Sequence, residues 1–185
     1  DQEPIRSFID NIYTFAVEDV WNVASKIFII PGLGISRKDN LLAQDYNKKT
    51  NEIVDFESQK MDYAYNYQIA TLYNFANNNS LSFSFSHKTR FATLKDRYSY
   101  RLGKSVPNPF LKPEKSNNFD LSYTFQTTNI FFKSSVFYSK LSDAIILVDN
   151  ATENKSQTQN KGNAKFYGFE AEIDINPLKF LVLRV

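Results

Sequence analysis

A basic and aromatic stretch between residues 88 and 104 holds the side chains best suited to bind a ligand. Guanidinium and ammonium groups donate charge-assisted hydrogen bonds to anions, and phenol rings add stacking surface. The candidate binding residues are Arg90, Lys95, Arg97, Tyr98, Tyr100, Arg101 and Lys104. Only Asp96 opposes their charge. The competing interpretation, which a run of charge favours by itself, is a loop that is merely solvated.

The other polar residues do not form a catalytic pattern. A Ser-His-Asp triad needs a histidine backed by an acid, and the only histidine, His87, continues an apolar face just beyond Phe85. Glu170, Glu172 and Asp174 alternate along one face of a segment, where facing water explains them more simply than acid–base chemistry does. We therefore expect no enzyme activity, no metal site and no cofactor.

Composition excludes several further classes. The chain has 185 residues, 22 Lys+Arg against 20 Asp+Glu and no cysteine, so thiolate metal sites and disulfides are impossible. The near-neutral balance argues against binding to nucleic acid. With 17 Phe, 11 Tyr and 1 Trp, the chain is too rich in apolar surface to be disordered. No apolar run approaches the roughly 18 residues of a membrane-spanning helix, and there is no signal-peptide pattern after Asp1.

Apolar residues recur with a period of two in segment after segment, which indicates β-strands. The clearest case is residues 62–75, where Tyr63, Tyr65, Tyr67 and Ile69 alternate with small or polar residues. Seven strands and the start of an eighth are expected at about residues 13–18, 27–36, 62–75, 81–86, 118–125, 130–138, 167–174 and 180–185. Pro31 is unusual within a strand, since it lacks the backbone N–H that a ladder needs.

The connections between these strands alternate between short and long. Short turns are expected near residues 22–25, 76–80, 126–129 and 176–178, and long polar loops at 38–60, 91–114 and 149–162. A repeated hairpin with tight turns at one end and long loops at the other is typical of an outer-membrane β-barrel, which has short periplasmic turns and long extracellular loops.

The charge pattern agrees with a membrane-facing wall. The apolar faces of the seven complete strands carry no Asp, Glu, Lys or Arg, while Glu18, Asp62 and Asp120 fall on the opposite faces. A charged side chain on the lipid face costs about 2–4 kcal/mol at mid-bilayer. The apolar faces are unusually aromatic, and Trp21 lies beside a short turn, where an interfacial aromatic girdle is expected. The fold class expected is therefore all-β, an antiparallel up-and-down transmembrane barrel segment of about eight strands.

Four motifs in the expected order resemble the barrel of TonB-dependent outer-membrane receptors. Residues 106–116, VPNPFLKPEKS, resemble the NP-x-LKPE-x-S entry into a barrel strand. Residues 15–33 resemble the F-x-x-D-x-W … PGL hairpin, which makes Pro31 expected. Residues 84–98 resemble S-x-x-F-x-x-P-T-L-x-x-L-Y, with Ala92 and Arg97 as departures, and residues 160–172 resemble N-x-G-x-A-x-x-x-G-x-E-x-E. The motif residues are Asn108, Pro109, Leu111, Lys112, Pro113, Glu114, Gly162, Gly168 and Glu170.

The resemblance implies a transporter. Such receptors have a plug domain, which contacts TonB, inside a barrel of roughly 22 strands in the outer membrane of Gram-negative bacteria. Residues 1–185 are then part of that barrel, without plug or C-terminal strands. The implied partners are outer-membrane lipid, the TonB complex and a small metal chelate, most commonly a ferric siderophore or another iron or haem chelate. For His87, a structural or interfacial role is favoured over that of a haem ligand.

A self-contained barrel of eight strands is the alternative, either an outer-membrane adhesion or anchoring protein or a soluble lipocalin-like carrier. The strand count fits this architecture. The long loops exceed what a lipocalin uses at every second connection, and the last expected strand stops at Val185 in mid-strand. An internal stretch of a larger barrel is therefore the preferred interpretation.

Overall fold

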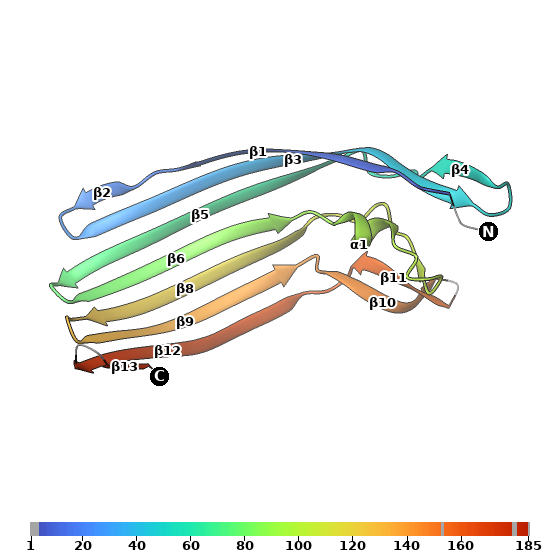
Figure 1. Ribbon diagram of the computed structural model, residues 1–185. Coiled ribbons are helices and arrows are strands. Elements are labelled where there is room, and N and C mark those ends of the chain that lie inside the picture. The colour runs from blue at the N-terminus through green and yellow to red at the C-terminus, as the bar shows by residue number, and fades with distance from the viewer. Residues whose placement is uncertain (1–3, 153, 179–180, 185) are drawn as a thin grey trace.

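One curved antiparallel sheet makes up most of the computed structural model, which describes residues 4–152, 154–178 and 181–184 (Figure 1). Its main path contains eight strands, and each pairs with the next along this path. In order they are β1 (Phe8–Glu18), β3 (Ile27–Asn47), β5 (Met61–Ala76), β6 (Asn79–Arg90), β8 (Glu114–Gln126), β9 (Ile130–Ser142), β12 (Ala164–Leu178) and β13 (Leu181–Arg184). The predicted up-and-down arrangement of about eight strands is confirmed, and the sheet is open among the described residues.

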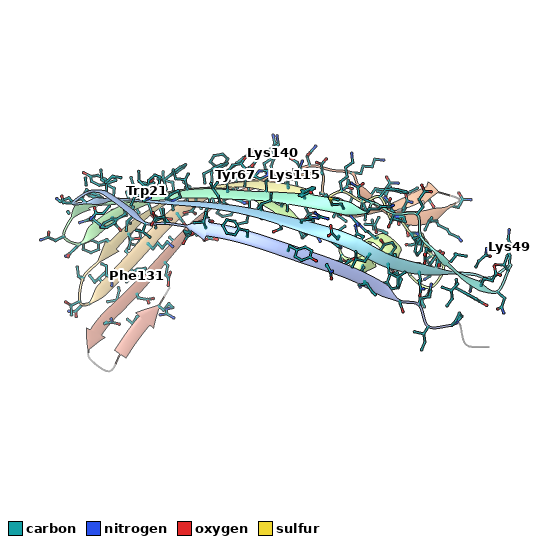
Figure 2. The ribbon with its side chains drawn as sticks, turned by 90° about the horizontal axis from the view of Figure 1, so that it is seen from above. Trp21, Lys49, Tyr67, Lys115, Phe131 and Lys140 are labelled. Atoms are coloured by element: carbon teal, nitrogen blue, oxygen red, sulfur yellow. The ribbon has the colours of Figure 1, made fainter. Side chains whose placement is uncertain are left out.

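The register places the two predicted faces on opposite sides of the sheet. Phe119 lies opposite Phe85 and Tyr138, whereas the neighbouring Asp120 lies opposite Ser84 and Phe137. Residues directly opposite one another in antiparallel strands point to the same side of the sheet. The alternate positions that carry the aromatic side chains therefore form one continuous surface across the strands. We call this the outer face and the other the inner face. The side chains of both faces are seen in Figure 2.

The outer face exposes large apolar side chains. Relative exposure reaches 71% at Phe15, 64% at Leu33 and 67% at Phe169. A contiguous apolar surface of this kind is not stable against water and marks a surface that is covered in the native environment. None of the described residues belongs to a helix long and apolar enough to span a membrane.

Pro31 lies inside β3, near its start, without disrupting the strand. Its carbonyl accepts a hydrogen bond from the Asp19 N–H at 3.2 Å, so its nitrogen faces the same neighbour. That neighbour is interrupted there: β1 ends at Glu18, and β2 (Trp21–Ala24) begins the next paired segment. The missing N–H of the proline therefore costs no ladder hydrogen bond.

Short connections gather at one end of the sheet and long ones at the other (Figure 1). Two expected turns are displaced. Residues 22–24 belong to β2, so the first reversal falls at Ser25 and Lys26, and residues 176–178 still belong to β12. The reversal after β12 and the predicted strand start at Phe180 lie outside the described residues.

All three expected long loops contain regular structure. In the first, β3 continues to Asn47 and pairs with β4 (Glu52–Asp55). The second contains α1 (Leu94–Tyr98) and β7 (Ser105–Val106), and the third contains the second half of β10 (Ile145–Thr152) together with β11 (Lys155–Asn160). Strands β10, β11 and β7 form a small separate sheet. The sequence does not predict these elements within the loops, and β11, with the sequence KSQTQN, has no apolar alternation that would reveal it.

Candidate functional site

The candidate site lies where the segment between β6 and β8 folds onto the loop-side end of the sheet. This segment begins with α1, whose N-terminus is closed by a capping box: the Thr93 hydroxyl accepts from the Asp96 N–H at 3.1 Å, and the Asp96 carboxylate accepts from the Thr93 N–H at 3.0 Å. Reciprocal capping satisfies two backbone donors at once. A short helix therefore begins two residues after Ala92, at whose position the family motif has a proline.

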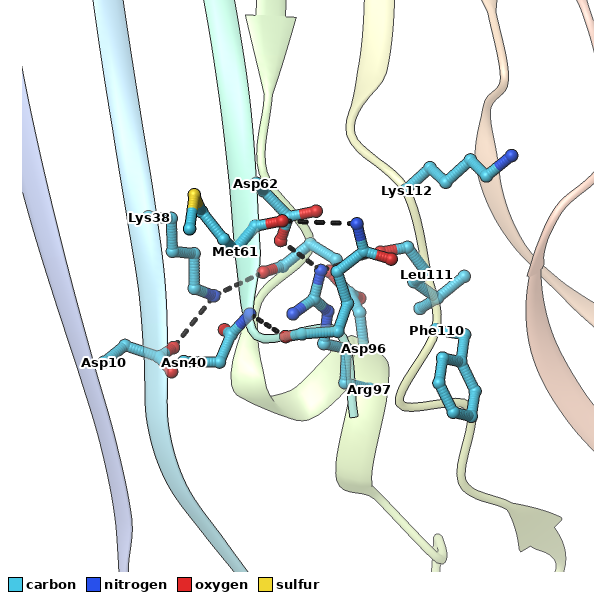
Figure 3. A network of polar contacts seen from close by, with 12 residues as sticks. Asp10, Lys38, Asn40, Met61, Asp62, Asp96, Arg97, Phe110, Leu111 and Lys112 are labelled. Carbon is cyan, nitrogen blue, oxygen red and sulfur yellow. Dashed lines mark hydrogen bonds and ion pairs between the residues drawn. The ribbon is translucent and has the colours of Figure 1, made fainter. Parts of the chain in front are cut away.

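Arg97, on this helix, is fully buried against the inner face (Figure 3). Its Nη2 lies 2.5 Å from Oδ2 of Asp62 on β5 and donates to the Leu111 carbonyl at 2.7 Å. Asp62 is only 4% exposed. A buried guanidinium needs such a partner because an unpaired charge in the interior is strongly unfavourable. This ion pair holds α1 against β5.

A second buried cation anchors the same segment. The Lys38 ammonium, on β3, lies 2.8 Å from Oδ2 of Asp10 on β1 and donates to the Ala92 carbonyl at 2.9 Å (Figure 3). Lys38 is 3% exposed. The two ion pairs, Lys38–Asp10 and Arg97–Asp62, thus connect three neighbouring strands to the segment that crosses them. We call them the inner latch.

Tyr98 packs into a small aromatic cluster instead of reaching solvent. Its ring centroid lies 5.2 Å from that of Phe8 and 5.1 Å from that of Phe56, and the residue is 6% exposed. The structure therefore places two of the seven predicted binding residues, Arg97 and Tyr98, in the interior of the segment, where they stabilise it.

Arg90 is engaged at the surface of the same region. Its Nε donates to Glu114 at 2.7 Å, and its Nη1 lies 3.4 Å from Asp96. The hydrogen bond from Arg90 lowers the pKa of Glu114, against the opposing effect of burial. Burial raises the pKa of Asp96, but hydrogen bonds from Thr93 and the charge of Arg90 together leave it below its usual value. Both carboxylates therefore stay ionised at neutral pH.

Four predicted binding residues remain near the loop surface. Tyr100 donates its hydroxyl to Asp45 on the extended part of β3. Lys95, Arg101 and Lys104 are exposed, the last two in a tight turn where Arg101 and Gly103 have positive φ values of 44° and 84°. The structure brings these side chains to one end of the sheet and separates them from the buried Arg97. Their role in ligand binding stays a prediction.

The residues of the resembling motifs brace the loops. Asn108 donates its backbone N–H to the Arg97 carbonyl at 2.7 Å and its side-chain amide to the Thr158 carbonyl at 2.9 Å. Leu111 is 1% exposed, and the Asn160 side chain exchanges hydrogen bonds with both backbone groups of Lys112. Pro109 and Pro113 are half-buried, Gly162 has a φ of 147°, and Glu170 is exposed on the inner face.

Gly168 leaves room for the aromatic ring of Phe137, which lies against its backbone. A Cβ at this position would lie 2.8 Å from two ring atoms of Phe137, which is its direct partner on β9. The Phe137 side chain therefore covers the glycine on the inner face. This contact accounts for an aromatic residue at position 137, on the inner face of β9, where the alternation of the strand favours a polar one.

His87 lies on the outer face and has local partners. Its ring stacks on that of Tyr67 with centroids 4.8 Å apart, and its Nδ1 lies 2.7 Å from the Asn117 side-chain oxygen. Among the described residues no three His, Cys, Asp or Glu side chains are grouped as metal ligands. These contacts fit the predicted structural role of His87 at an interface.

A groove of about 540 Å³ follows β1, β3, β5 and β6, lined mainly by inner-face residues. Its lining includes Gly34 and Gly32, and the Gln68 side chain covers Gly32. At one side, the Gln68 amide donates to the Glu18 carboxylate at 2.6 Å. The groove offers hydrogen-bonding groups but no arrangement of nucleophile and base.

The comparisons with known proteins agree with this architecture. A family model described as "TonB dependent receptor-like, beta-barrel" matches residues 4–184. The chain belongs to this family. Members of the TonB-dependent receptor family are transporters and not enzymes, and they form outer-membrane β-barrels. A search of curated proteins gave no match.

Solved TonB-dependent barrels share the fold. The copper transporter OprC has a TM-score of 0.71 at 16% identity, over 92% of this chain and 27% of its own. The Serratia marcescens hemophore receptor HasR, solved with its hemophore HasA and haem, has a TM-score of 0.72 at 14% identity, over 89% of this chain and 32% of its own. The Neisseria meningitidis iron transporter FrpB has a TM-score of 0.67 at 16% identity, over 91% of this chain and 24% of its own. The chain therefore spans about a quarter to a third of these receptors.

Proposed function

We propose that this chain is a section of the barrel wall of an outer-membrane receptor that takes up a scarce ligand by TonB-dependent transport. The observation that carries the proposal is the continuous aromatic outer surface of an open antiparallel sheet, in a chain that belongs to the TonB-dependent receptor family. Among the described residues, its charged side chains lie only toward the loop-side end, as Arg37 and Lys140 do. The remaining strands and a plug domain that contacts TonB would be supplied by other parts of the receptor.

The ligand we propose is a ferric siderophore or another iron or haem chelate. Names of proteins with the same fold support this class, since they include an iron transporter, a hemophore receptor and the siderophore receptor PirA of Acinetobacter baumannii. The exposed cations Lys95, Arg101 and Lys104 are the proposed contacts, because chelates of this kind are commonly anionic and ammonium and guanidinium groups bind anionic oxygens. Arg90 and Tyr100 would support them by fixing the loop.

Uptake of radiolabelled iron chelates by cells that carry the full receptor as their only such transporter tests this function. We expect uptake of at least one chelate, its loss when TonB is deleted, and weaker binding in the variant Lys95→Gln/Arg101→Gln/Lys104→Gln. The matched control is Lys49→Gln, in the turn between β3 and β4, with unchanged binding. TonB-independent uptake, or equal binding by both variants, would contradict the proposed mechanism or the proposed contacts, respectively.

Size and location of the native protein separate the receptor from a self-contained barrel. An antibody against residues 91–114 should detect a heat-modifiable band several times larger than 21.4 kDa in the outer-membrane fraction. A band near 21 kDa there would favour an adhesion or anchoring barrel, and a band of that size in the soluble fraction would favour a lipocalin-like carrier.

A further inference from the structure

Three lysines gather on the outer face at the loop-side ends of β8, β9 and β12. Lys165 lies directly opposite Lys140, and Lys140 lies directly opposite Asn117, two residues from Lys115 on the same face. All three are exposed, and Lys115 and Lys140 lie on the same convex face as Tyr67 in Figure 2. We call Lys115, Lys140 and Lys165 the outer lysine cluster.

This cluster has no internal compensation for its charge. Like charges directly opposite on antiparallel strands destabilise the pair, and neighbours on the diagonal lie only about 7–8 Å apart. The outer faces of β6, β8, β9 and β12 carry no carboxylate among the described residues, and none of the three lysines has an ion pair there. By contrast Arg37, on the outer face of β3, is paired with Asp39 at 2.6 Å. The cluster is therefore open to pairing with an external anion.

The surroundings indicate where that anion comes from. One register step toward the middle of the sheet, Phe119, Tyr138 and Tyr167 form a row across the same three strands. The rings of Phe119 and Tyr138 are 6.3 Å apart. Such aromatic rows lie at the boundary between hydrocarbon and headgroups in membrane barrels. The cluster, immediately beyond the row on the loop side, is thus at headgroup depth in the outer leaflet.

We propose that the outer lysine cluster binds the phosphate groups of a phosphorylated lipid of the outer leaflet. This inference rests on the proposed outer-membrane location. Ammonium groups act as compact charges toward phosphate, and three of them on adjacent strands of one face can hold the phosphates of one headgroup. Binding removes the repulsion between Lys140 and Lys165, so lipid and wall stabilise each other.

Native mass spectrometry of the full receptor, purified from the outer membrane in neutral detergent and titrated with lipid A, tests the proposal. The test variant is Lys115→Gln/Lys140→Gln/Lys165→Gln. The matched control, Lys49→Gln/Lys88→Gln/Lys133→Gln, removes the same charge from the loop tip and the inner face. We expect wild type and control to bind bisphosphorylated lipid A alike and the test variant to bind it roughly 100-fold more weakly. Dephosphorylated lipid A should bind all three weakly.

Equal binding by the test variant and the control, or equal binding of dephosphorylated lipid A, would overturn the inference. Displacement of the lipid by low concentrations of inorganic phosphate would also overturn it, since the site would then be one for free anions. A triple Lys→Arg variant, which keeps the charge, should retain binding and guards against a folding defect, which heat-modifiability reports independently. Absence of the receptor from the outer membrane would instead refute the proposed function.

Discussion

The inner and outer faces of the sheet use positive charge in opposite ways at the same end of the molecule. On the inner face, Lys38 and Arg97 are buried and each has a carboxylate partner. On the outer face, Lys115, Lys140 and Lys165 are exposed and have no carboxylate beside them. The difference shows that the same residue types can fix a loop segment on one face and meet the surroundings on the other, depending on whether a carboxylate lies within reach.

Breaking the inner latch should have the largest effect. Arg97→Leu leaves the buried Asp62 carboxylate without its partner, and we expect a loss of about 3–5 kcal/mol in the stability of this region. Hydrogen exchange and limited proteolysis of residues 91–113 in the full receptor would measure it. Removing both charges, in Arg97→Leu/Asp62→Asn, should recover much of the loss, whereas Lys95→Leu, on the exposed side of α1, should change little. Equal effects of the two single variants would argue against the latch.

Packing on the inner face should be the next most sensitive feature. Gly168→Ala forces the Phe137 ring to move, and we expect a loss of about 1–3 kcal/mol in a denaturant titration of the full receptor. The outer-face control is Ala171→Val on the same strand, whose added methyl groups point away from the sheet. If both substitutions lower the free energy of unfolding equally, the two faces do not differ in packing.

Acid should weaken the loop through Glu114. Because Arg90 lowers its pKa in the folded state, this carboxylate stabilises the fold above its unfolded pKa of about 4.3, and that contribution is lost as the pH falls through the lower folded value. The loss should stay below about 1 kcal/mol, since the Arg90 side chain is 48% exposed. Proteolysis rates at residues 91–113 should be flat from pH 7 to 5 and rise below about pH 4. In Glu114→Gln the added pH dependence should be absent.

Relieving repulsion in the outer lysine cluster should have the smallest effect and the opposite sign. In neutral detergent without lipid, Lys165→Gln removes one of two directly opposed charges and should stabilise the barrel by roughly 0.2–1 kcal/mol at low salt. The gain should vanish near 1 M salt, where the screening length is about 3 Å. A destabilising Lys165→Gln in lipid-free detergent would show that the cluster is not repulsive.

The strands of the main sheet could be predicted from the sequence because one face of each meets an apolar environment. Period-two alternation then marks every crossing, as in Tyr63 to Tyr67 on β5 and Phe119 to Phe125 on β8. The extended end of β3 and the strand β11 escaped prediction because neither face of these segments is apolar. Their pairing depends on partners that local sequence does not reveal.

The candidate site was predicted in position but only partly in detail. Exposed residues such as Lys95 and Arg101 lie at the loop end as expected. Arg97 was grouped with them because its charge suggested a surface, although the resembling motif commonly has an apolar residue there. The structure keeps position 97 buried and neutralises its charge with Asp62, 35 residues earlier. Asp10, Lys38 and Asp62 were missed as latch residues, since only the folded register brings them together.

The length of β3 determines what lies farthest from the cell. Its 21 residues, at about 3.3 Å each, extend roughly 70 Å, whereas a tilted strand needs only about 9–11 residues to cross the hydrocarbon core. In the proposed orientation, the hairpin of β3 and β4 therefore rises well above the lipid, with Lys49 at its tip (Figure 2). Antibodies and phages would meet this hairpin early, so it is a natural target for immune recognition and for epitope insertion.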